Sequence, residues 1–165
     1  MPYYFAYGTL QRRFSNYDAF ADVLREPRGR FRTVDPYPLV VPRAAACTNP
    51  GCRFVHRMAA LLPDRGQGER VEGDVYELDE EALSRLDTLE TAYERRSVSV
   101  ERGDERLEAQ VYFVTDAEPW RKLLAAGEAD AFARYTPELA EGPLKPCCVA
   151  SPGHEPPHDV ISPFD

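Results

Sequence analysis

The chain contains 165 residues, with 28 acidic and 20 basic side chains and a net charge of −8. Its length suits one domain that can bury a sizeable core. The acidic balance argues against a nucleic-acid-binding surface, and no apolar run reaches the length that spans a membrane. The first ten residues, MPYYFAYGTL, lack the basic flank of a signal peptide. We therefore expect a cytoplasmic protein that binds neither nucleic acid nor membrane.

Aromatic residues alternate at the beginning of the chain, at Tyr3, Phe5 and Tyr7, which predicts a buried strand. The strand runs into the tetrapeptide Tyr-Gly-Thr-Leu at residues 7–10. Gly8 permits backbone angles that other residues avoid, and it lets a ligand approach the main chain. N–H groups that follow a strand end can hold a carboxylate or a developing oxyanion, so this segment is a candidate anion site.

The next part of the chain predicts scaffold elements. Residues 11–25 show a helical pattern in their second half. Residues 31–41 resemble a strand that Pro36 and Pro38 interrupt, which restricts it to an edge or an irregular position. An apolar run at residues 54–62 predicts a further strand.

Residues 71–100 predict a strand, a helix and a second strand. Apolar and polar residues alternate over residues 71–76, which is the period of a half-buried strand. Asp79 then offers a helix N-cap, and Glu80 and Glu81 suit the positive end of the helix dipole.

The predicted helix carries one acidic residue on its apolar face. Leu83, Leu86 and Glu90 fall at positions i, i+3 and i+7, which share a face. A carboxylate that faces inward loses hydration and gains proton affinity, so Glu90 is a candidate general base or acid. The spacing alone leaves a second interpretation open, in which Glu90 is exposed at the helix end or paired with Arg95 or Arg96.

The last third of the domain predicts a hairpin and a helix. Alternation around residues 98–100 and 107–113 predicts two strands, with residues 101–106 as a charged turn between them. Residues 117–135 are predicted to be largely helical, with an interruption at Gly127.

Six prolines between residues 142 and 165 exclude a regular element there. We therefore predict one domain over residues 1–141 and a C-terminal extension, residues 142–165, that packs on the domain or trails from it. The sequence is compatible with a monomer or a homodimer.

The cysteines allow two interpretations. Cys47, Cys52 and His56, together with Cys147 or Cys148, could hold a structural zinc ion. Their irregular spacing favours reduced thiols and no metal, as expected for a cytoplasmic chain.

Several motifs, in chain order, resemble the γ-glutamylcyclotransferase-like superfamily, and in particular its γ-glutamylamine cyclotransferase branch. No single motif is specific, but their order is. They are FAYGTL at residues 5–10 followed by Gln11-Arg12, YPLV at 37–40, GDVY at 73–76, LDTLE at 86–90 followed by Tyr93 and Arg95, and AQVY at 109–112.

The resemblance implies an α+β fold, a small mixed β-barrel with flanking helices. It implies a reaction in which the α-amine of a γ-glutamyl amide attacks its own γ-carbonyl, releasing 5-oxoproline and a free amine, with no cofactor and no metal. Glu90 is the catalytic residue that it implies, and the substrate-binding residues are Tyr7, Gly8, Thr9, Leu10, Tyr93 and Arg95.

Two other functions remain open at this stage. The chain could be a non-catalytic domain that binds a small molecule, or an accessory hydrolase or transferase domain built on the same barrel. The presence of Glu90 together with the segment at residues 7–10 favours the cyclotransferase. The leaving amine is not specified, and the unmatched segments 42–56 and 142–165 are candidates for selecting it.

Overall fold

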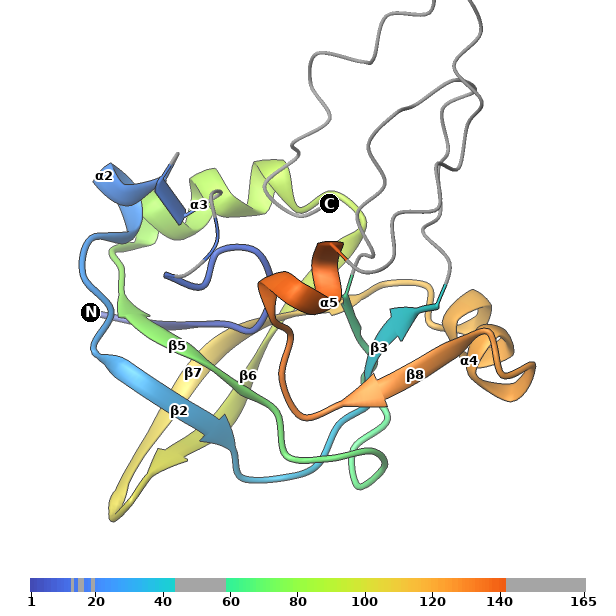
Figure 1. Ribbon diagram of the computed structural model, residues 1–165. Helices are drawn as coiled ribbons and strands as arrows, with labels where there is room; N and C mark the ends of the chain where they lie inside the picture. The colour runs from blue at the N-terminus through green and yellow to red at the C-terminus, as the bar shows by residue number, and fades with distance from the viewer. Residues whose placement is uncertain (13, 15–16, 19, 44–58, 142–165) are drawn as a thin grey trace, which may run out of the picture.

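The computed structural model describes residues 1–12, 14, 17–18, 20–43 and 59–141. Their centre is a closed barrel of five strands in the order β1-β5-β2-β6-β7 (Figure 1). The strands are β1 (Tyr3–Ala6), β5 (Glu72–Glu77), β2 (Gly29–Thr33), β6 (Tyr93–Arg102) and β7 (Glu105–Val114). β1 pairs with β7 in parallel and the other pairs are antiparallel. The predicted α+β class with a small mixed barrel is confirmed.

A second sheet of three strands stands beside the barrel, in the order β4-β3-β8. It consists of β4 (Ala60–Leu61), β3 (Leu39–Pro42) and β8 (Ala129–Phe132). The single irregular or edge strand predicted at residues 31–41 is therefore wrong. Pro36 and Pro38 separate two strands, because neither residue can donate to a ladder, and β3 is the central strand of its sheet.

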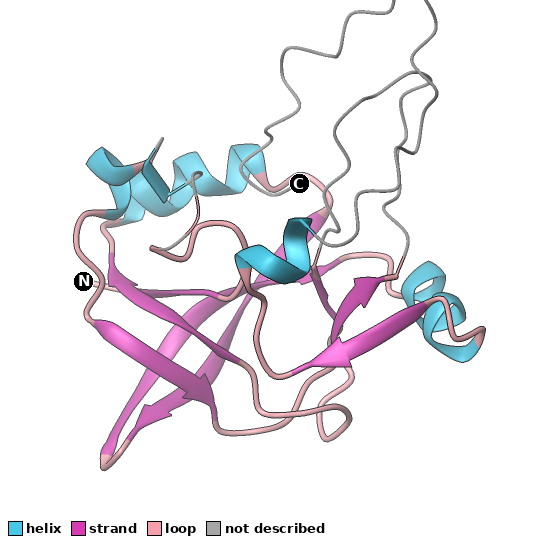
Figure 2. Cartoon of the chain, viewed as in Figure 1, coloured by secondary structure: helices cyan, strands magenta, loops and turns pink. Residues whose placement is uncertain are grey.

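The described helices are short and cover the outside of the sheets (Figure 2). They are α2 (Ala21–Leu24), α3 (Glu80–Leu89), α4 (Glu118–Ala125) and α5 (Pro137–Glu141). α3 begins where the sequence predicts, since the Asp79 carboxylate accepts the Ala82 N–H at 2.7 Å.

The helix predicted over residues 117–135 is wrong in its second half. Gly127 has φ of 71°, a backbone conformation that glycine adopts readily and that ends α4. The residues that follow pair with β3 as strand β8, in a register that joins Leu39 to Phe132 and Pro42 to Ala129. Pairing with an available strand edge overrides the helix preference of the alanines there.

The hairpin of β6 and β7 has a tighter turn than predicted. Arg102 pairs with Glu105 in the ladder, so only Gly103 and Asp104 form the turn, and Gly103 has φ of 57°. The other charged residues predicted for the turn belong to the strands. They tolerate strand positions because opposite charges face each other on the exposed side, as Glu101 and Arg106 do at 3.3 Å.

Both faces of β1 are buried, which sets the position of the site. Phe5 and Tyr7 point into the barrel core, among the apolar residues of β2, β5, β6 and β7. Tyr4 and Ala6 point outward, into a second cluster that α2 and α3 cover. The chain leaves β1 at Tyr7 with its aromatic side chains fixed on both sides of the sheet.

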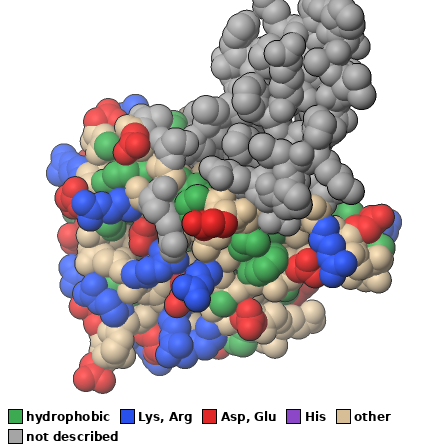
Figure 3. Space-filling model, in the orientation of Figure 1, with side chains coloured by type: hydrophobic (Ala, Val, Ile, Leu, Met, Phe, Trp, Pro, Cys, Tyr) green, Lys and Arg blue, Asp and Glu red, His purple; other side chains and the backbone are tan. Residues whose placement is uncertain are grey.

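On the face shown in Figure 3, basic and acidic side chains lie interspersed over the barrel. No helix in the described part of the chain is long and apolar enough to cross a membrane. The cytoplasmic location, the absence of a nucleic-acid partner and the division at residue 142 stay predictions.

Candidate active site

Glu90 directly follows the last residue of α3, and its N–H donates to the Leu86 carbonyl at 3.0 Å. Its side chain points inward as the periodicity predicts, and the residue is only 6% exposed. The two arginines of the alternative interpretation are engaged elsewhere, since Arg95 pairs with Asp87 at 3.0 Å and Arg96 with Glu94 at 2.9 Å. A solvated surface role for Glu90 is therefore excluded.

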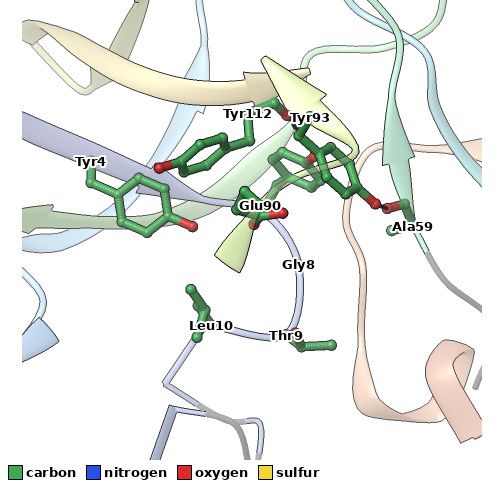
Figure 4. A pocket seen from close by; sticks show the side chains of 9 residues that line it. Tyr4, Gly8, Thr9, Leu10, Ala59, Glu90, Tyr93 and Tyr112 are labelled. Carbon is green, nitrogen blue, oxygen red and sulfur yellow. Dashed lines mark hydrogen bonds between the residues drawn. The ribbon is translucent and has the colours of Figure 1, made fainter. Parts of the chain in front are cut away.

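A cavity opens around the Glu90 carboxylate. The space in it that is open to the centres of water molecules is about 30 Å³. Figure 4 shows Glu90 with the rings of Tyr4 and Tyr112 on one side and Tyr93 on the other, facing the segment at residues 8–10. The described residues that line it are Tyr4, Tyr7, Gly8, Thr9, Leu10, Ala59, Glu90, Tyr93 and Tyr112.

The tyrosine hydroxyls tie the cavity wall to the main chain and to α3. Tyr7 donates to the Tyr112 carbonyl at 2.6 Å, and Tyr93 reaches the Ala59 carbonyl at 3.5 Å. Tyr112 donates to the Asp87 carboxylate at 2.7 Å. Asp87 lies one helical turn before Glu90, so the last turn of α3 both anchors the Tyr112 ring and leads into Glu90.

Glu90 is the one charged side chain among the described residues of the cavity wall. Burial, and then the charge of Glu90, raise the pKa of Tyr4 well above its ordinary value. Burial is also the main cause that raises the pKa of Tyr7 well above its ordinary value, and electrostatic repulsion from Tyr93 and Glu90 adds to the effect. The pKa of Tyr112 is raised first by burial and then by its bond to Asp87. These phenols stay neutral at physiological pH and can donate hydrogen bonds.

Gly8 differs in one respect from the sequence-based prediction. It is not among the glycines with positive φ, so its backbone is open to other residues. Within the described part of the chain, a Cβ built at Gly8 meets no heavy atom within 4 Å. The open space agrees with the other property expected of Gly8, which is that a ligand can closely approach the main chain there.

The structure brings together six of the seven predicted site residues. Arg95 is the exception, because it does not line the cavity and reaches it only through Asp87 and Tyr112. The sequence analysis missed Tyr4, Ala59 and Tyr112 as wall residues. Tyr112 ends the AQVY motif, whereas Tyr4 lies just before the FAYGTL motif, on the face of β1 that packs against α2 and α3.

The described residues contain no group of three or more His, Cys, Asp or Glu side chains that could hold a metal ion. The alternative zinc site at Cys47, Cys52, His56 and Cys147 or Cys148 lies outside the described residues. Both interpretations of those cysteines stay open.

A small mixed barrel with the buried Glu90 carboxylate in a cavity, opposite the glycine-containing segment that follows β1, defines a small-molecule site suited to acid–base chemistry. Comparison with known proteins identifies the family. The chain belongs to the γ-glutamyl cyclotransferase, AIG2-like family, whose model matches residues 4–130. The resemblance stated from the sequence motifs is confirmed.

Individual relatives agree with this assignment. Human γ-glutamylaminecyclotransferase is 34% identical over 112 residues, which cover 64% of this chain and 66% of the human protein. γ-Glutamylaminecyclotransferase B of Danio rerio is 34% identical over 131 residues, which cover 72% of this chain and 62% of that protein. The crystal structure of an AIG2-like protein from Mus musculus superposes with a TM-score of 0.65 at 28% identity, covering 88% of this chain and 97% of that chain. The chain thus spans less than two thirds of the length of these two curated relatives.

Proposed function

We propose that the protein is a γ-glutamylcyclotransferase-type enzyme that converts a γ-glutamyl amide into 5-oxoproline and a free amine. The observation that carries the proposal is Glu90, a residue only 6% exposed, in a cavity whose opposite wall is formed by residues 8–10. Membership of the family and the names of the relatives support the same reaction.

The reaction begins with the α-ammonium group of the substrate, which must lose a proton before it can attack. Glu90 accepts that proton, and the freed α-nitrogen forms a bond to the γ-carbonyl carbon. Glu90 then returns the proton to the departing nitrogen as the bond between that nitrogen and the γ-carbon breaks. The attacking nitrogen loses a second proton as it becomes the lactam N–H, and this proton ends on the released amine, which leaves as an ammonium ion. Atoms and charge balance without water or a redox partner, because the nucleophile belongs to the substrate.

The backbone N–H groups near Gly8, Thr9 and Leu10 are the candidates for stabilising the oxyanion of the tetrahedral intermediate or the substrate carboxylate. Tyr7 and Tyr93 form side walls that keep the substrate in register with Glu90. Because Arg95 is bound to Asp87, we assign it an indirect part, through Asp87 and Tyr112, in addition to any contact with substrate.

A chromatographic assay for 5-oxoproline tests the proposal. The purified chain is incubated with γ-glutamyl dipeptides, a γ-glutamyl-ε-lysine compound and a γ-glutamyl polyamine. Glu90→Gln, prepared in the same way, serves as the control for contaminating activity. We expect turnover of at least one compound, and a loss of about a hundredfold to ten-thousandfold in kcat for the variant. Turnover that is equal in both proteins would remove Glu90 from the mechanism, and binding without turnover would favour the non-catalytic alternative.

A further inference from the structure

Gln11 lies directly behind the cavity segment and is completely buried. Its side-chain nitrogen Nε2 is 2.6 Å from the Tyr7 carbonyl oxygen and 3.0 Å from that of Gly8. The same nitrogen is 3.0 Å from the Tyr135 carbonyl oxygen, which lies between β8 and α5. One buried amide N–H₂ group thus donates hydrogen bonds to three backbone carbonyls, two of them from the segment that faces Glu90.

The orientation of this amide is fixed by its other end. Arg30 Nη1 donates to the Gln11 Oε1 at 2.9 Å, and because arginine can only donate, the oxygen of the amide must face it. Arg30 is also 3.3 Å from Asp74, which accepts the Arg12 N–H at 2.9 Å. Gln11 therefore has no freedom to flip, and its N–H₂ group faces the carbonyls.

Holding these carbonyls determines where the neighbouring N–H groups point. In a planar trans peptide the C=O and the N–H of the next residue point in opposite directions. The Tyr7 and Gly8 carbonyls point toward Gln11, so the N–H groups of Gly8 and Thr9 point away from it. Gly8 and Thr9 line the cavity that contains Glu90. Tyr76 holds the next part of the segment in the same manner, since its hydroxyl donates to the Leu10 carbonyl at 2.9 Å.

We propose that Gln11 is a positioning residue, which aims the N–H groups of Gly8 and Thr9 at the oxyanion that develops on the substrate's γ-carbonyl oxygen. The proposal rests on the proposed cyclotransferase function and assigns the oxyanion, rather than the substrate carboxylate, to these two N–H groups. Gln11 itself touches no substrate. Its contribution is made before the reaction, by fixing donors that would otherwise have to reorient.

The test compares Gln11→Met with the wild-type chain in the 5-oxoproline assay. Methionine has a similar length and no N–H donor, so the carbonyls are released while the volume is kept. We expect kcat to fall about tenfold to a hundredfold, less than the loss of a whole oxyanion donor, with KM changed by less than about threefold. A substrate-carboxylate role for the same N–H groups predicts a rise in KM instead, and that result would overturn the proposal.

Thr33→Val is the matched control. Thr33 is also fully buried and also ties backbone together, since it donates to the Asp35 carbonyl at 2.7 Å and accepts the Val71 N–H at 2.9 Å. It does not line the cavity. We expect this variant to lose stability and to keep the wild-type kcat, which separates general destabilisation from positioning.

If Gln11→Met does not fold, Arg30→Met decides the question. The Arg30 side chain is 34% exposed, and its loss frees the Gln11 amide to rotate without opening a cavity in the core. A kcat that falls at constant KM supports the proposal, and an unchanged kcat contradicts it. Wild-type turnover is measured first, so a chain that forms no 5-oxoproline refutes the proposed function, whereas active variants refute only the role of Gln11.

Discussion

At the scale of single residues, the electrostatics of the cavity favour a cationic ligand. Glu90 is the charged residue of the described wall, and its neighbours Tyr4, Tyr7 and Tyr112 are phenols whose raised pKa values keep them neutral. A buried carboxylate is most stable opposite a cation. The α-ammonium group of the proposed γ-glutamyl substrate supplies one, and the transfer of its proton is the first step of the proposed reaction. In the proposed reaction, one carboxylate would therefore both bind the nucleophile and activate it.

Gly8→Ala tests whether the open space beside the backbone belongs to the substrate. The added methyl group meets no described atom, and the backbone angles of Gly8 suit alanine. We expect the free energy of unfolding to stay unchanged or to rise by up to about 1 kcal/mol. We expect kcat/KM for 5-oxoproline formation to fall by on the order of tenfold to a hundredfold, because the methyl group displaces the substrate from Glu90. Denaturant unfolding and steady-state kinetics on the same preparation measure the two effects.

A stable Gly8→Ala protein with wild-type kcat/KM would mean that the substrate does not approach this part of the main chain. A destabilised variant would mean that Gly8 is needed for the turn itself. Only the combination of retained stability and lost activity agrees with the proposed site.

At the scale of elements, Gly73 gives the opposite expectation, since alanine at this position should destabilise the fold. Gly73 on β5 lies against the end of β1, where a Cβ would stand 2.8 Å from Phe5 Cζ and closer still to the Ala6 carbonyl oxygen. The Phe5 ring can move, but the Ala6 oxygen is backbone and belongs to the ladder between β1 and β5. Gly73→Ala should therefore lower the free energy of unfolding by about 1–3 kcal/mol. Urea denaturation checks this, and Gly8→Ala is the matched substitution that should not show it.

The elements that could be predicted from the sequence are those whose signal is local. Glu90 was placed on the inner face of α3 because the spacing from Leu83 and Leu86 is set within one helix. The Asp79 cap is equally local. The motif order then supplied the barrel, which no periodicity could have given.

The elements that were missed depend on partners far away in the chain. β8 forms because residues 129–132 pair with the edge of β3, and nothing in the sequence of those four residues indicates that pairing. Gln11 acquires its role from the Tyr135 carbonyl, 124 residues later, and from Arg30 on β2. Gln11 was recognised only as part of the motif after residues 5–10, and nothing local assigns a role to its amide, so this part of the site required the structure.

At the scale of the whole molecule, tyrosine burial links the fold to pH. Tyr4, Tyr7, Tyr76 and Tyr112 are buried where the barrel meets the helices and the cavity, and burial is the leading cause that raises the pKa of each. In the unfolded chain these phenols titrate near their ordinary value of about 10. The folded state binds their protons more tightly, so their contribution to stability is complete below about pH 10 and decreases as the pH rises beyond it.

We therefore expect the free energy of unfolding to fall above about pH 10, with each such tyrosine adding up to about 1.4 kcal/mol per pH unit to the slope. Urea unfolding between pH 8 and pH 11.5 measures it, and tyrosinate absorbance of the folded chain reports how many phenols remain un-ionised. Two lysines, four cysteines and the other tyrosines also titrate in that range, so the contribution of one buried phenol is read from the difference between wild type and a single variant. Tyr7→Phe loses the hydrogen bond to the Tyr112 carbonyl and should be less stable at pH 8. Its free energy of unfolding should, however, fall less steeply with pH, by the contribution of one tyrosine. Equal slopes in both proteins would contradict the link between these buried phenols and alkaline stability.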